Sequence, residues 1–89
     1  GEQQVTTFRA SFVKAYGITI TFEEGVLAYL TKQAEGEGVS VDALCEQLFG
    51  DYGHGLKLLG KDTFAITLEA AEKPKEHLDY LVKTFYNQS

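Results

Sequence analysis

The 89-residue sequence contains no methionine and no tryptophan, and it has only one cysteine and one proline. The single cysteine, Cys45, has no partner within the chain, so no internal disulfide holds the fold, and a reducing cytoplasmic setting fits best. No apolar run approaches the roughly 20 residues that a membrane helix needs, and no signal-peptide pattern occurs. The missing methionine and the opening Gly-Glu-Gln-Gln predict a fragment cut from a longer protein.

Basic charge is also scarce. The formal net charge is -5, and the eight basic residues are scattered from Arg9 to Lys83 without forming a stripe. Proteins that bind nucleic acid carry such a stripe to contact phosphates, so we expect no nucleic acid partner, and no membrane partner either. A hydrophobic content of 44% is enough for a core without disulfides. The sequence therefore predicts a single small domain over residues 1–89.

In the first half of the chain the spacing of the apolar residues changes from that of a helix to that of a strand. Apolar residues at helical spacing predict a helix over residues 3–16 that ends at Gly17. Ile18, Ile20 and Phe22 then alternate with threonines, as in a half-buried strand. Thr21 and Glu24 fit a capping box, which predicts that the next helix, over residues 23–35, begins near Glu23.

A glycine-containing break over residues 35–38 precedes Ser40, a good N-cap for a third helix that is expected to stop near residues 53–55. The segments 56–59 and 64–68 predict either a hairpin or a loop that leads into one strand. Pro74 suits the first turn of a last helix, lined on one side by Leu78, Leu81, Val82 and Phe85. We therefore expect an α+β fold of about four helices with a small two- or three-stranded sheet.

Residue types that could carry chemistry are few. Cys45, His54 and His77 are the soft metal ligands, and their spacing matches no zinc signature. Residues 55–62 match a phosphate-binding loop up to the last position, where Asp62 stands in place of serine or threonine. That segment also lacks a preceding strand and a following helix. We predict no catalytic, cofactor-binding or metal-binding residue in the chain.

Tyrosines are numerous for a domain of this size, at positions 16, 29, 52, 80 and 86. Tyr16 and Tyr52 fit apolar stripes that face the core. Tyr29 and Tyr80 lie off the main apolar faces, and tyrosine is enriched at protein interfaces. We predict Tyr29 and Tyr80 as contacts for another protein, against the alternative that they are single exposed aromatics.

The span from about Phe8 to Leu68 resembles the C-terminal small subdomain, or lid, of Clp-type AAA+ unfoldases. In that family a helix ends in a glycine, an alternating strand leads into a helix start, and a glycine-containing loop precedes a helix with an apolar stripe. The matching segments are residues 15–27, 36–39 and 41–51.

The resemblance implies an AAA+ lid-like fold, a fragment that is not itself catalytic, and a parent chain that binds ATP and magnesium and hydrolyses ATP. The lid's partners would be its own large AAA+ domain and neighbouring subunits. The family usually places a phosphate-contacting arginine in the turn that reads Gly38-Val39-Ser40 here, so no residue is assigned a nucleotide contact. An adaptor domain that binds a protein by itself, without an ATPase, is the alternative, and a small enzyme has the least support.

Overall fold

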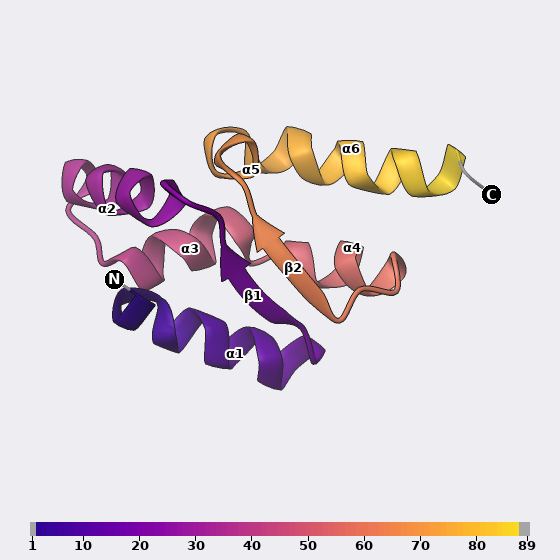
Figure 1. Ribbon diagram of the computed structural model, residues 1–89, viewed down its shortest axis with the longest axis horizontal. Coiled ribbons are helices and arrows are strands. Elements are labelled where there is room, and N and C mark those ends of the chain that lie inside the picture. The colour runs from indigo at the N-terminus through magenta and orange to yellow at the C-terminus, as the bar shows by residue number, and fades with distance from the viewer. Residues whose placement is uncertain (1, 88–89) are drawn as a thin grey trace.

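The computed structural model describes residues 2–87 and has an α+β fold in which helices predominate (Figure 1). A 3₁₀ turn and α1 open the chain, and β1 precedes the two helices α2 and α3. A short helix, α4, leads to β2, and the helices α5 and α6 close the chain. The bounds are Glu2–Val5 for the 3₁₀ turn, Thr6–Tyr16 (α1), Thr19–Phe22 (β1), Val26–Glu37 (α2), Val41–Phe49 (α3), Tyr52–Leu58 (α4), Thr63–Ile66 (β2), Leu68–Glu72 (α5) and Pro74–Asn87 (α6).

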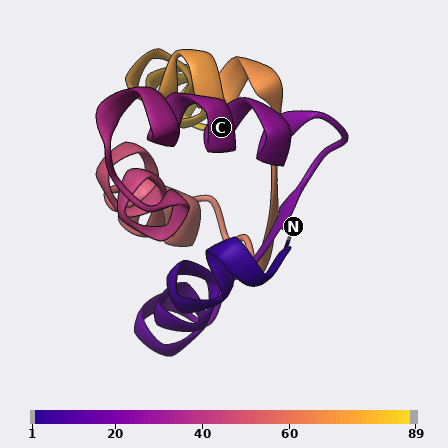
Figure 2. The same cartoon turned by 90° about the vertical axis from the view of Figure 1, so that its left-hand side faces the viewer.

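The sheet consists of β1 and β2, which pair in parallel with Thr19 opposite Thr63 and Phe22 opposite Ile66. Parallel strands need a long crossover, and here α2, α3 and α4 supply it. Figure 2 shows the two strands together along one side of the molecule, with the helices on the other side. The sequence left a hairpin and a single strand as alternatives, and the structure has a single strand, β2, fed by the turn after α4.

The core lies between the inner face of the sheet and the helices. Ile18, Ile20 and Ile66 point inward and are buried, whereas the threonines of the outer face are exposed, as the alternation predicts. The aromatic rings of Phe8, Phe12, Phe49 and Tyr52 form a continuous series of tilted and edge-to-face contacts between α1, α3 and α4. The predicted core stripes of α1 and α3 are therefore confirmed, except at Val13 of α1, which was expected on the stripe and is 48% exposed.

The predicted capping box at Thr21 is wrong. Thr21 lies within β1, and α2 begins at Val26 after Gly25, whose φ of 85° is in the left-handed region. The N–H of Glu23, where the helix was expected to start, donates to the carbonyl of Ile66 at the end of β2. Pairing with a strand more than 40 residues later in the chain therefore extends β1 through the segment that local capping would have made helical.

The predicted helix stop at residues 53–55 is also wrong. The third helix ends earlier, at Phe49, and α4 runs through both Gly53 and Gly55. A Cβ at Gly53 would lie 2.2 Å from the ring of Tyr16 on α1, and one at Gly55 would lie 2.8 Å from Leu78 on α6. These glycines therefore let α4 approach two other helices closely, which accounts for glycine within a helix despite its cost.

Two further features of the chain's end differ in outcome. The last helix begins at Pro74 as expected, although none of its residues is fully buried. The helix α5 was not predicted; its first turn is capped by the Thr67 hydroxyl, which accepts from the N–H of Ala70 at 3.1 Å.

The break expected at residues 35–38 is shorter than predicted, because α2 continues to Glu37 and is capped by Gly38.

A backbone N–H in the first turn of α1 donates a hydrogen bond to a residue of another helix. Val5, its N-cap residue, provides no side-chain acceptor, and the Asp42 carboxylate of α3 accepts instead from the Phe8 N–H at 2.9 Å. The neighbouring residue Ser40 caps α3 itself, with its hydroxyl accepting from the Ala43 N–H at 3.1 Å, as the sequence predicts. Asp42 therefore links the first turns of two helices through a bond to a residue 34 positions earlier in the chain.

Replacing Asp42 with alanine is expected to destabilise the fold by about 1.5 to 3 kcal/mol, because a partly buried amide loses a charged acceptor. Asp42→Asn keeps an acceptor oxygen and is expected to recover a substantial part of that loss. Urea titration of the three proteins measures the difference. Equal midpoints for Asp42→Ala and the wild type would show that the bond to Phe8 contributes nothing.

Candidate functional site

The exposed aromatic residues gather on α6. Tyr80 is 63% exposed, and Phe85 and Tyr86 are exposed on the last turns of the same helix. The inner side of α6 packs on α4, where Leu78 and Val82 face Gly55. No residue of α6 is fully buried, and its exposed aromatic rings point in different directions, since Phe85 follows the side of Leu78 and Val82 whereas Tyr80 lies away from that side. We call Tyr80, Phe85 and Tyr86 the α6 aromatic surface.

The two predicted contact tyrosines lie on different helices. Tyr80 belongs to the α6 aromatic surface and has His77 as its ring neighbour, with centroids 6.3 Å apart. Tyr29 is half-buried on α2, packs against the core, and borders a shallow hollow with Lys32 and Gln33. Both assignments stay predictions. Phe85, which the sequence placed on the inner stripe, is more exposed than that assignment predicts.

The possible metal ligands do not converge. Within residues 2–87 no three histidine, cysteine or acidic side chains are arranged to hold a metal ion. Cys45 is buried in the core, His54 is exposed beside the Tyr16 ring, and His77 lies on α6. The segment that partly matches a phosphate loop, residues 55–62, contains the end of α4 and a turn with Lys61 and Asp62 exposed. It therefore lacks the strand-loop-helix geometry of a phosphate site.

The turn where the resemblance places an arginine holds Val39, which is 39% exposed. It borders a hollow lined by residues of the 3₁₀ turn, α2 and α3, among them Glu35 and Asp42. The free N–H groups at the start of α3 are already partly satisfied by the Ser40 hydroxyl. This hollow offers an anion two carboxylates and no cation from the described residues that line it.

Charge is distributed unevenly along the chain. Residues up to Asp51 include eight acidic and three basic side chains, whereas those after it include five of each. The whole net charge of -5 therefore lies in the part that forms α1, β1, α2 and α3. The part that carries the α6 aromatic surface is neutral, so apolar contact there is not opposed by a net charge.

The Cys45 thiol is buried, an environment that disfavours the nucleophilic thiolate. Burial raises its pKa to about 12, and the negative charges of Asp42 and Glu46 add to the effect. The reactive form of cysteine is the thiolate, which is absent near neutral pH at such a pKa. Burial likewise raises the pKa of the Tyr52 hydroxyl to about 12.

The raised pKa values of the Cys45 thiol and the Tyr52 hydroxyl predict that the fold loses stability in alkali. A thiol whose pKa rises from 9.0 to about 12 on folding stabilises the native state fully below pH 9, and that contribution is lost as the pH rises toward 12. We expect Cys45 to account for a loss of about 1 to 2 kcal/mol by about pH 10.5. Urea titrations at several pH values, with Cys45→Ala as the control, isolate the thiol. Parallel curves for both proteins would contradict the assignment.

Within residues 2–87 every helix is too short or too polar to span a lipid bilayer. Comparisons with protein-family models, with curated proteins and with solved structures found no match to this chain.

Proposed function

We propose that this domain is the C-terminal lid subdomain of a Clp-type AAA+ unfoldase and couples the nucleotide state of a larger chain to contacts between subunits. The observation that supports the proposal is the order of the elements. A helix that ends at Gly17, a strand, three helices and a returning strand follow one another over the span, Phe8 to Leu68, in which the sequence resembles that family. The lid would act mechanically, through packed surfaces, and perform no chemistry itself.

The partners under this proposal are the chain's own large AAA+ domain and the neighbouring subunits. The α6 aromatic surface is the best candidate for one of these contacts, since it combines exposed aromatic side chains with a neutral part of the chain. ATP and magnesium would be bound by the large domain. The single buried cysteine supports a cytoplasmic location for the whole protein.

A protein-binding adaptor without any ATPase is the second candidate. It is favoured by the same exposed aromatic residues, which would serve a separate partner equally well. The coding sequence upstream of residue 1 separates the two proposals. A phosphate loop followed by an acidic, magnesium-binding strand would support the lid, and an upstream sequence without them would leave the adaptor as the better proposal.

For the isolated 89 residues we expect no ATP hydrolysis and no ATP binding tighter than about millimolar, because the chain is acidic and the Val39 turn carries no cation. Calorimetry with magnesium and ATP measures this. Micromolar binding that disappears in Lys61→Ala would instead assign residues 55–62 to a nucleotide site.

In the longer chain, Tyr80→Ala combined with Phe85→Ala is expected to weaken assembly and ATP hydrolysis together while the domain stays folded. Lys14→Ala, an exposed change on α1, is the matched control. Normal assembly of the Tyr80→Ala/Phe85→Ala protein would remove the α6 aromatic surface from the proposal.

A further inference from the structure

The two strands of the sheet differ at their outer edges. In the ladder, the N–H of Thr19 donates to the Asp62 carbonyl at 2.9 Å and that of Glu23 to the Ile66 carbonyl at 3.0 Å. Bonding groups alternate along a strand, so the even-numbered residues of β2 face β1 and the odd-numbered ones face away. Thr63 and Ala65 therefore direct their N–H and C=O groups to the outer edge of β2, and no described residue bonds to them there.

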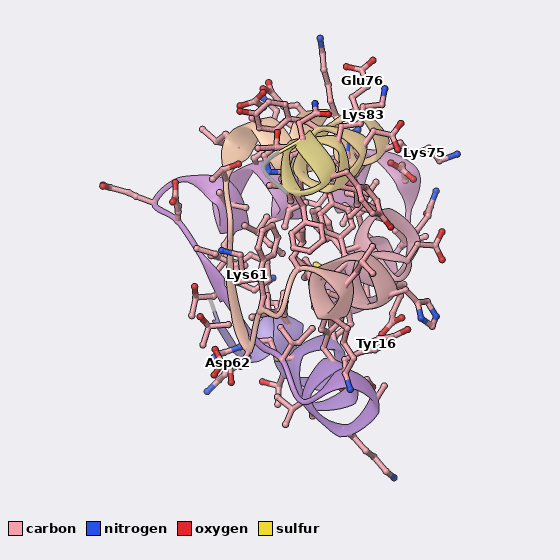
Figure 3. All side chains as sticks on the ribbon, turned by 90° about the vertical axis from the view of Figure 1, so that its right-hand side faces the viewer. Tyr16, Lys61, Asp62, Lys75, Glu76 and Lys83 are labelled. Carbon is pink, nitrogen blue, oxygen red and sulfur yellow. The ribbon has the colours of Figure 1, made fainter. Side chains whose placement is uncertain are left out.

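The edge of β2 is open, whereas the edge of β1 is not. Ile20 is the corresponding residue of β1, and it is only 1% exposed, backbone included. Thr63 and Ala65 are both exposed. Figure 3 views the molecule from the side of β2 and shows no other helix or strand in front of it. Of the two edges, only that of β2 has room for another chain.

Apart from its length of only four residues, β2 lacks the features that usually protect an edge strand. Its sequence, Thr-Phe-Ala-Ile, contains no charge and no proline, and the register with β1 is continuous, without a bulge. Natural proteins commonly use charges, prolines or bulges to keep an exposed edge from pairing. An edge without them, on a strand in which threonine, phenylalanine and isoleucine favour β structure, is suited to pair with an extended segment.

The inner side of this edge is apolar. α4 packs behind β2, where the rings of Tyr52 and Phe64 lie 5.7 Å apart. Leu59, directly after α4, is half-buried against the core, whereas Leu58 is 47% exposed and lies about 200° around the helix from the buried Leu56, so it faces away from the sheet. A strand added to β2 would place every second side chain on the α4 side of the sheet and the other side chains beside the outer threonines.

We propose that the outer edge of β2 binds an extended segment of a partner protein, which pairs with Thr63 and Ala65 and inserts alternate apolar side chains toward α4. Lys61 precedes the strand and lies beside it in Figure 3, is exposed, and has no ion pair within the described residues. It favours an acidic residue at one end of the segment. The inference is independent of the proposed lid function.

A whole second domain fits this edge less well than a single strand. Figure 1 shows α6 running on past β2 toward the same side of the molecule. A helix of 14 residues is about 21 Å long, so it limits the approach of another folded sheet along that side. An extended segment is only one strand wide, about 5 Å, and avoids α6.

The test uses two capped peptides of alternating valine and threonine, one with glutamate at its first position and one with glutamate at its last. We expect at least one to bind saturably and to protect the amide protons of Thr63 and Ala65 from exchange. Ala65→Pro removes an outward N–H, which an edge strand tolerates, and is expected to weaken binding at least about tenfold with an unchanged melting temperature. Ala65→Ser keeps the N–H and is the matched control.

A peptide N-methylated at the amides that face β2 tests the same bonds without altering the protein, and it is expected not to bind. The proposal is overturned if neither unmodified peptide binds at millimolar concentration, or if the methylated peptide binds equally well. Sedimentation that shows a dimer lost in Ala65→Pro would also overturn it, because a second copy would then occupy the edge.

Discussion

Gly53→Ala is expected to destabilise the protein by about 1 to 3 kcal/mol, although alanine is the better helix former by about 1 kcal/mol. The new methyl group would lie 2.2 to 2.3 Å from three ring atoms of Tyr16. That ring is held between Phe12, at a centroid distance of 5.1 Å, and His54, at 5.4 Å. It cannot move aside without losing these contacts, so α1 and α4 must separate.

Gly36→Ala is the matched control for this substitution. Gly36 also lies within a helix, α2, and nothing stands within 4 Å of the position its Cβ would take. Alanine there should stabilise the fold by about 0.5 to 1 kcal/mol. Thermal melts of the two proteins should therefore shift in opposite directions. A higher melting temperature for Gly53→Ala would mean that α4 and α1 are not in close contact.

Tyr52→Ala is expected to cost about 3 to 5 kcal/mol, the typical loss for a buried aromatic side chain. Tyr52 is buried, its ring contacts Phe49 edge-on and Phe64 at a tilt, and its hydroxyl donates to the Pro74 carbonyl at the start of α6. One side chain thus connects α3, β2 and α6. A loss of this size is a large part of the free energy of unfolding of a small domain.

Tyr52→Phe distinguishes the contribution of the hydroxyl to stability from that of the ring. It removes only the hydrogen bond to Pro74, and the expected loss is about 0.5 to 1.5 kcal/mol. Urea titration gives both values, and amide exchange reports whether the first turn of α6 opens in the phenylalanine variant. Equal stabilities for Tyr52→Ala and Tyr52→Phe would place the ring outside the core.

The helices were predictable where the apolar period is long. The stripes of α1 and α3 and the caps at Gly17 and Ser40 are local signals, and the structure agrees with them. The errors arise where tertiary contacts override a local signal. Thr21 resembles a cap, but it pairs in a strand with a distant partner. Gly53 resembles a turn residue, but it allows two helices to approach each other.

The candidate surfaces were predictable only in part. Tyr80 was selected because it lies off the apolar stripe of its helix, and it is indeed exposed. The open edge of β2 had no local signal, since an edge is defined by which strands pair and which do not. The sequence indicated a strand at residues 64–68, but neither its parallel pairing with β1 nor its exposed side follows from that pattern.

The parallel pairing also has a consequence during synthesis. Thr19 meets Thr63, so β1 leaves the ribosome 44 residues before its partner. At roughly 5 to 20 residues per second this is a wait of about 2 to 9 s. During that interval the apolar side of β1 has no sheet partner. Until β2 is synthesised, only helices made before it, such as α1, can cover Ile18 and Ile20 from within the chain.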